Sequence, residues 1–234
     1  VERCQFDTVR MVMGINPDEF CWNLKAGDEF QAPEVVMVYS AEGLGEMTRS
    51  YHAFYRRHLI RSPYNHKKRP ILINNWEATY FDFNEEKILK IAEQAQKLGI
   101  EMLVLDDGWF GKRDDDNSGL GDWFVNEKKM NGSMAQLAEK IHKMGMKFGL
   151  WFEPEMISED SDLYRAHPDW AFAVPGRVPN HGRNQLVLDM TRDDVREYLL
   201  ERLTTIVHDA EIDYVKWDMN RSICDIYSYV AAQN

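Results

Sequence analysis

The chain has 234 residues, of which 44% are hydrophobic and 12% aromatic, so it contains enough apolar material for one large core. It has no run of about 18 apolar residues, the length that a membrane-spanning helix needs, so we predict no membrane partner. The formal net charge of −11, without clusters of basic residues, argues against a nucleic acid as the substrate.

The cysteines and histidines give no sign of a metal or cofactor site. Cys4, Cys21 and Cys224 form neither a CxxC pair nor an even-numbered disulfide framework, so we predict a reducing, cytoplasmic setting. The seven histidines show no paired ligand spacing. The acidic run at residues 114–119 has Val125 where a calcium loop needs its glutamate, so we interpret the run as a solvated turn. We predict no metal and no cofactor.

The first 42 residues differ in texture from the rest of the chain. Glycines and prolines separate short runs of alternating polarity, such as residues 30–39, and this pattern is typical of strands joined by turns. We interpret residues 1–42 as the C-terminal part of a β-sandwich domain. Residues 43–69 then supply a helix, predicted over 44–59, and a basic linker into the next domain.

Short apolar runs from residue 70 onward end in acids, amides or tryptophans. We predict five strands from these runs; with their polar ends they cover residues 71–76, 102–107, 148–153, 186–189 and 212–218. Continuous apolar runs of this kind are typical of strands that are buried on both faces of a parallel sheet.

Helical patterns lie between the predicted strands and carry their own start signals. In chain order these signals are Asn84, Ser133 with Gln136, and Thr191 with Asp194. Gly99 and Gly145 end the first two helices. We also predict a short helix over 160–167 and a further helix that begins near Ser222.

The alternation of strands and helices predicts an α/β fold with a parallel sheet. A doubly wound sheet would show a glycine-rich phosphate turn after its first strand, and residues 74–77, NNWE, form no such turn. A (β/α)8 TIM barrel instead collects polar groups from many strand ends. We therefore predict that residues 70–234 are the N-terminal part of a barrel, about its first five βα units. Since five units cannot close the ring and the chain begins at Val1, we expect a fragment of a longer protein.

The strand ends together supply carboxylates and indole rings, which a sugar pocket needs. The carboxylates are Asp106, Asp107, Glu153, Asp189 and Asp218, and the tryptophans are Trp76, Trp109, Trp151 and Trp217. Carboxylates accept hydrogen bonds from hydroxyls, and indole faces pack on a pyranose. Asp218 suits the nucleophile of a retaining glycosidase, because Lys216 points to the same side of the strand and favours the ionised carboxylate. Trp217 points to the other side, where we expect it to pack.

Two other classes of protein fit the same residues. In a metal-dependent barrel enzyme of the enolase type, the strand-end acids would hold Mg²⁺ and Lys216 would be the base. The four tryptophans favour a sugar over a hydrated ion. In a non-catalytic module, the unpaired edges of an open barrel would favour association with another chain.

Six motifs follow one another between residues 70 and 221. They are NNWEA at 74–78, LDDGW at 105–109, GDW at 121–123, LWFEPE at 150–155, QLVLD at 185–189 and KWDMNR at 216–221. In this order they resemble glycoside hydrolase family 36, the bacterial-type α-galactosidases. The stretch upstream of residue 70 resembles the end of that family's N-terminal β-domain.

The resemblance implies a retaining α-galactosidase with a covalent galactosyl intermediate on Asp218. The implied substrate-binding residues are Trp76, Asp106, Asp107, Trp151, Arg183, Lys216 and Asn220, with the two aspartates on the 4- and 6-hydroxyls of galactose. In the family the acid/base aspartate lies on a later strand, which this chain does not contain, so we expect the isolated chain to be inactive. The implied partners are small galactosides. A homo-oligomeric parent stays open, and so does galactosyl transfer of the raffinose- and stachyose-synthase type.

Overall fold

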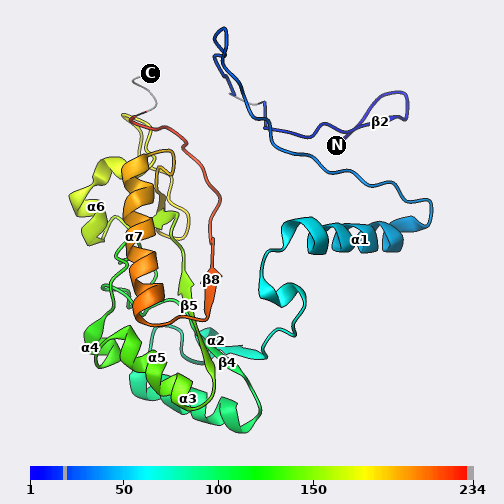
Figure 1. Cartoon of the computed structure of the whole chain (residues 1–234). Helices are drawn as coiled ribbons and strands as arrows, with labels where there is room; N and C mark the ends of the chain where they lie inside the picture. Colours follow the sequence, from blue (N-terminus) through cyan, green and yellow to red (C-terminus); the bar gives the residue numbers. More distant parts are fainter. Residues whose placement is uncertain (18–19, 231–234) are drawn as a thin grey trace. The chain divides into compact units, whose positions relative to one another are not determined.

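The computed structural model describes residues 1–17 and 20–230 (Figure 1). The chain divides into two compact units, Val1–Lys68 and Arg69–Asn234. Within the described part of the chain, no helix combines the length and the apolar character needed to cross a membrane. Cys4, Cys21 and Cys224 are all free thiols.

The first unit contains little sheet. Its strands β1 (Glu2–Arg3) and β2 (Val9–Arg10) form a two-residue antiparallel pair, and residues 30–39 contain no strand, although their alternation predicts one. A strand forms only where a neighbour completes its ladder, and an isolated hairpin is marginal in water. The β-sandwich assignment of residues 1–42 therefore stays a prediction.

A helical segment follows in the same unit and covers the predicted span 44–59. Helix α1 (Gly43–Phe54) continues into the π-helical turn η1 (Tyr55–Leu59), and a 3-10 turn, η2 (Pro63–Asn65), begins after Ser62. The Ser62 side chain accepts a hydrogen bond from the backbone N–H of Tyr64, as an N-cap does.

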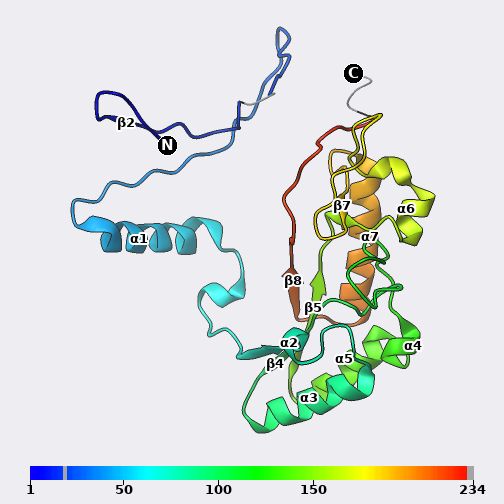
Figure 2. The same ribbon diagram turned by 180° about the vertical axis from the view of Figure 1, so that it is seen from behind.

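A four-stranded parallel sheet forms the centre of the second unit. Its strands are β3 (Leu72–Asn74), β4 (Met102–Leu105), β5 (Lys147–Phe152) and β8 (Tyr214–Trp217), in the order β3-β4-β5-β8 (Figures 1 and 2). Strand β4 and most of β5 are buried, which explains why their sequences are continuous apolar runs rather than alternating ones. The parallel sheet confirms the predicted α/β fold.

The predicted strand at residues 186–189 is not part of this sheet. Strand β7 (Leu186–Val187) pairs in antiparallel register with β6 (Met156–Ile157), a two-residue strand that follows β5 in the chain. Strand β8 consequently lies directly beside β5. The apolar run correctly indicated burial, but its hydrogen-bond partner is a nearby loop strand. The count of five barrel strands is thus wrong for the described residues, in which four parallel strands are present.

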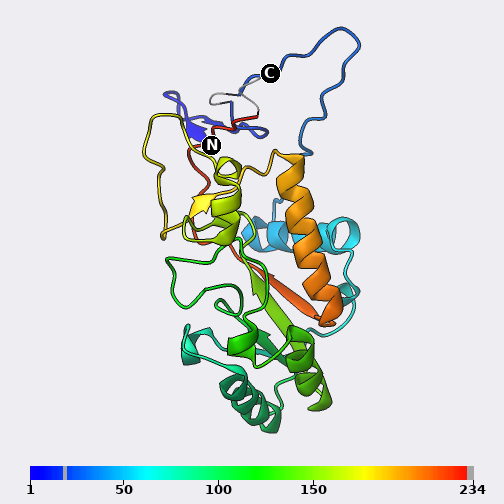
Figure 3. The same ribbon diagram turned by 90° about the vertical axis from the view of Figure 1, so that its left-hand side faces the viewer.

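Helices cover the sheet of the second unit. They are α2 (Trp76–Thr79), α3 (Glu85–Lys97), α4 (Glu127–Met130), α5 (Met134–Lys143), α6 (Asp162–Ala166) and α7 (Asp193–Asp209), with the 3-10 turn η3 (Pro168–Trp170) after α6. Helix α5 contacts both α3 and α7, and α7 runs beside the strands (Figure 3). The cap at Asn84 and the capping box of Ser133 and Gln136 are confirmed.

Two predicted helix features are wrong. Helix α7 begins after Arg192, so Arg192 and not Thr191 occupies the N-cap position, and no side chain caps the helix. The Thr191 hydroxyl donates a hydrogen bond to Asp189 Oδ1 instead. Residues 221–230 contain no helix, although one was predicted to begin near Ser222. Residues 231–234, the end of that prediction, lie outside the described part.

Candidate active site at the strand ends

The carboxyl ends of the four parallel strands bring Asp106 and Lys216 together. Asp106, buried at the end of β4, accepts a hydrogen bond of 2.7 Å on Oδ2 from the Lys216 ammonium of β8. The same oxygen accepts a hydrogen bond from the Asn74 side-chain amide of β3. The backbone N–H of Asp106 donates to Asn75 Oδ1 at 2.7 Å. Asp106 is therefore fixed by residues of two other strands, as a group at the edge of a parallel sheet can be.

Asp218 lies at the end of β8 with several donors around it. Its Oδ2 accepts hydrogen bonds from Trp151 Nε1 at 2.9 Å and from Asn220 Nδ2 at 3.0 Å, and Lys216 Nζ stands 3.9 Å away. Its Oδ1 accepts one from the backbone N–H of Met219. Partial burial alone would raise the pKa of Asp218, but these hydrogen bonds and the Lys216 charge hold its pKa below the ordinary value. Asp218 is therefore poised as a carboxylate.

Asp107 follows Asp106 and has a buried arginine as its partner. Arg113 Nε lies 3.0 Å from Asp107 Oδ1, and Arg113 Nη2 lies 2.9 Å from Oδ2. Burial raises the pKa of Asp107 above the ordinary value even though the Arg113 hydrogen bonds and charge oppose that shift. No sequence signal distinguished Arg113, since it stands in a loop rich in charged residues that reads as solvated.

Glu153 is fully buried behind Asp218 at the end of β5. Its Oε1 accepts a hydrogen bond from the backbone N–H of Asn220, and its Oε2 accepts one from Gln185 Nε2 at 3.2 Å. Burial raises its pKa, and the charges of Asp218 and Asp107 add to that shift. Glu153 thus fixes the turn that carries Asn220, a role that sequence alone left ambiguous.

We expect Glu153→Gln to stabilise the full-length protein more at neutral than at acidic pH. A carboxyl whose folded-state pKa is raised costs stability above its unfolded-state pKa, ~1.4 kcal/mol for each unit of the shift, and costs nothing once both states are protonated. The gain in Tm over the wild type should therefore be larger near pH 7 than near pH 4.

A matched control for this prediction is Glu139→Gln on α5. Glu139 is exposed and its pKa is lowered by the Lys143 hydrogen bond, so its replacement should give no gain at neutral pH. Thermal unfolding of both variants at the two pH values is the measurement. Equal gains for Glu153→Gln at both values would contradict a raised pKa of Glu153.

The remaining predicted site residues differ in how they join this cluster. Trp151 is 1% exposed and meets Asp218 through its indole N–H, so its ring is core rather than an open pocket wall. The backbone N–H of Trp76 donates to Asn74 Oδ1, and its ring meets Phe81 edge-on at 5.0 Å. Arg183 is exposed in the loop before β7 and, within the described residues, makes no hydrogen bond or ion pair to the cluster.

Asp189 does not reach the strand-end cluster, contrary to the prediction that groups it with the other acids. It is buried in the turn after β7, where Oδ1 accepts hydrogen bonds from the Thr191 backbone and hydroxyl. It misses the cluster because β7 is outside the parallel sheet. Among the described residues, no group of three or more His, Cys, Asp or Glu side chains is arranged to hold a metal ion.

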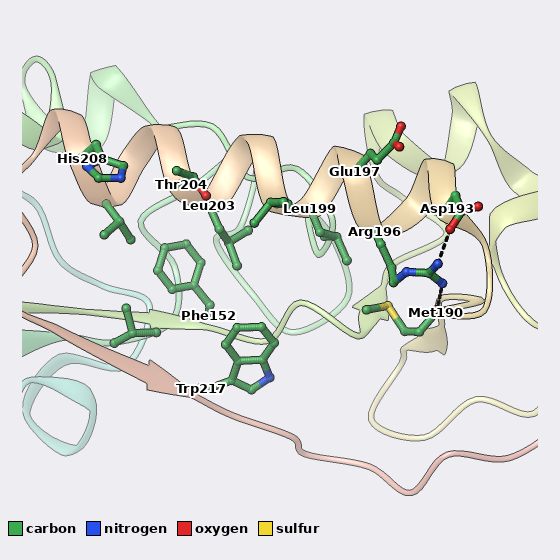
Figure 4. A pocket seen from close by; sticks show the side chains of 13 residues that line it. Phe152, Met190, Asp193, Arg196, Glu197, Leu199, Leu203, Thr204, His208 and Trp217 are labelled. Carbon is green, nitrogen blue, oxygen red and sulfur yellow. Dashed lines mark hydrogen bonds and ion pairs between the residues drawn. The ribbon is translucent and has the colours of Figure 1, made fainter. Parts of the chain in front are cut away.

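Trp217 packs less than predicted. The residue is 57% exposed and its indole N–H donates to Glu155. Together with Phe152, Leu199 and Leu203 it lines an apolar pocket of about 670 Å³ between α7 and the strands (Figure 4). None of the strand-end acids lines this pocket, so it is separate from the polar cluster.

The parallel sheet and the acids at its carboxyl edge define an α/β domain of the kind found in barrel enzymes. Residues 29–234 match the sequence model of the Melibiase family. The chain therefore belongs to the melibiase family, glycoside hydrolase family 36.

Several α-galactosidases are similar to this chain. The chain is 56% identical over 228 residues to α-galactosidase AgaA of Geobacillus stearothermophilus, covering 97% of this chain and 31% of that protein. The solved galactosidase domain of AgaSK, an α-galactosidase-sucrose kinase, is 53% identical with a TM-score of 0.92, covering 97% of this chain and 32% of that one. A crystallised AgaA variant in complex with raffinose is 56% identical with a TM-score of 0.89, covering 92% of this chain and 30% of that one. The chain thus spans about a third of the length of these relatives.

Proposed function

We propose that the full-length protein containing this chain is a retaining α-galactosidase that cleaves terminal α-galactosyl residues from galacto-oligosaccharides. The observation that carries the proposal is the setting of Asp218. Hydrogen-bond donors from β5 and from its own turn, together with the nearby Lys216 ammonium, hold the pKa of Asp218 low. The carboxylate therefore stays ionised, and the same hydrogen bonds fix its orientation. An oriented carboxylate of this kind is what a covalent glycosidase mechanism needs.

In the proposed reaction, Asp218 attacks the anomeric carbon. Oδ2 already accepts two side-chain hydrogen bonds, whereas Oδ1 accepts a single backbone one, so we assign the attack to Oδ1. Oδ2 then becomes the carbonyl oxygen of the glycosyl ester. The leaving group takes a proton from a second carboxyl, which the family resemblance implies on a later strand. Water then attacks the anomeric carbon, its proton passes to the second carboxylate, and the ester bond to Asp218 breaks. Galactose leaves with retention, because two inversions occur at one carbon.

The remaining cluster would bind the sugar. Asp106 and Asp107 are buried carboxylates and accept hydrogen bonds, so they suit the 4- and 6-hydroxyls of galactose. Lys216 and Asn220 would donate to hydroxyls near the nucleophile, and Trp76 and Arg183 would border the ring. Trp151 acts on the sugar through Asp218, since its ring is buried and its N–H is engaged there.

The test is covalent trapping of the full-length protein with a 2-fluoro-galactosyl donor, followed by peptide mapping. The 2-fluoro group slows hydrolysis of the intermediate, so label should accumulate on Asp218. Label on another residue would refute the assignment. With an unmodified donor, galactose as the product supports hydrolysis, whereas galactosyl sucrose formed from added sucrose supports the transferase alternative. Binding of Mg²⁺ with turnover that depends on it would support the metal-dependent alternative.

A further inference from the structure

Arg113 is a charged residue in an unusual place. It lies in the loop between β4 and α4 and is 1% exposed, although arginines are almost never fully buried without a partner. Its guanidinium meets both oxygens of Asp107, and its Nη1 donates to the Ser118 carbonyl oxygen at 2.8 Å. The two nearly parallel N–H donors give the bidentate geometry that fixes a carboxylate in orientation as well as in charge.

The loop is built closely around this arginine. Gly119 has φ of +81°, and a Cβ there would lie 3.1–3.3 Å from the backbone and Cβ of Arg113. Gly108, with φ of +105°, passes so close to Phe81 and the Arg113 carbonyl that a Cβ would meet them at 3.0 and 3.3 Å. The Phe81 ring covers the guanidinium at 5.5 Å. Arg113 therefore has one place to lie, against Asp107.

Among the charged groups around Asp107, Arg113 has the largest influence on whether Asp107 is ionised. Asp106 precedes it on β4, and the charges of Lys129 on α4 and Glu153 on β5 act on it from a longer range. Among the described charged residues, Arg113 is the one that forms an ion pair with Asp107. Without the guanidinium, burial and the neighbouring acids would favour a protonated Asp107, whose O–H donates a hydrogen bond where the carboxylate accepts one.

We propose that Arg113 is a positioning residue for substrate binding: it holds Asp107 as a carboxylate with its free lone pairs turned toward the sugar hydroxyls. This inference rests on the proposed function, in which Asp107 binds hydroxyls of galactose. Arg113 touches neither the sugar nor the reacting atoms. Since the hydroxyls that Asp107 binds are remote from the anomeric carbon, loss of Arg113 should raise KM more than it lowers kcat.

The test uses p-nitrophenyl α-D-galactopyranoside and the full-length protein, with kcat and KM measured from about pH 4 to 8. Arg113→Met should raise KM roughly 100-fold and move the acid limb of kcat/KM upward by about one pH unit or more, because an opposite charge at this distance shifts a carboxyl pKa by roughly 1–3 units. Arg113→Lys keeps the charge without the planar fork, so KM should rise about 10-fold with little movement of the acid limb. Arg165→Met removes an exposed, ion-paired arginine and should match the wild type.

The outcomes separate the inference from the proposed function. A wild-type protein that does not cleave the substrate refutes the proposed function. An active wild type with Arg113 variants that keep its KM and acid limb, and lose only Tm, makes Arg113 a scaffold residue and overturns the inference. If Arg113→Met does not fold, Arg113→Lys decides: a raised KM supports positioning, and an unchanged KM overturns it.

Discussion

Asp218→Ala is expected to lower kcat of the full-length protein on α-galactosides by roughly 10⁴-fold or more, as loss of a covalent nucleophile does. The reason is structural: Trp151, Asn220 and Lys216 remain in place, so the rest of the cluster persists while the proposed attacking oxygen is gone. Steady-state kinetics on p-nitrophenyl α-D-galactopyranoside measures the loss.

Added azide gives this prediction a positive signal. The small cavity left by the carboxylate would admit azide on the face from which Asp218 attacks, so the variant should form β-galactosyl azide from an α-galactoside. Asp160→Ala, which removes an exposed acid paired with Arg165, should keep the wild-type kcat. Full activity of Asp218→Ala would show that another group is the nucleophile.

Lys216→Met is expected to lower kcat/KM by roughly 100-fold, since a hydrogen bond to a charged group contributes about 1.5–3 kcal/mol. The ammonium binds Asp106 and stands near Asp218, so its loss affects the proposed sugar-binding acid and the proposed nucleophile together. The Lys216 charge is one of the causes that lower the pKa of Asp218. Its removal raises that pKa, so the acid limb of the pH profile should move to higher pH.

A matched control is Lys143→Met on α5, which breaks an exposed pair with Glu139. It should leave kcat/KM and the acid limb unchanged. A Lys216→Met enzyme with a lowered kcat/KM but an unmoved acid limb would mean that the ammonium serves Asp106 and the sugar alone. The pH profiles of both variants distinguish these results.

Local signals predicted local structure well. Asn84 and Ser133 were identified as helix caps because a capping bond joins atoms three residues apart, and both bonds are present. Thr191 with Asp194 shows the same spacing, but α7 begins one residue later, after Arg192, and the Thr191 hydroxyl donates to Asp189. The spacing alone does not determine at which residue a helix begins.

The sequence did not predict which strands pair when they lie far apart in the chain. The run at residues 186–188 is as apolar as the strands of the parallel sheet, and it is buried as predicted. It pairs with β6 at two positions, and no pattern in the sequence indicates this pairing. Apolar character indicates that a segment is covered, and it does not say by which neighbour.

The site was predictable where residues sit on strand ends. The position of Asp106, Lys216 and Asp218 follows from parallel strands that end at one edge, and the structure joins these three through Lys216. Arg113 and the indole N–H of Trp151 were missed as partners of the acids. Arg113 reaches Asp107 only because its loop folds back, and Trp151 reaches Asp218 from a neighbouring strand. In sequence, an arginine among aspartates is typical of an exposed loop.

The buried amide of Asn75 continues the pairing of β3 and β4 beyond the last strand residue. The backbone N–H of Asn75 donates to the Val104 carbonyl oxygen, while the side-chain oxygen of Asn75 accepts from the backbone N–H of Asp106. A slip of these strands by two residues would keep every side chain on its proper face and still break both bonds. Misaligned chains are thus penalised at the very position where the acid must stand, so a molecule with the wrong alignment during folding would also lack the assembled acid cluster.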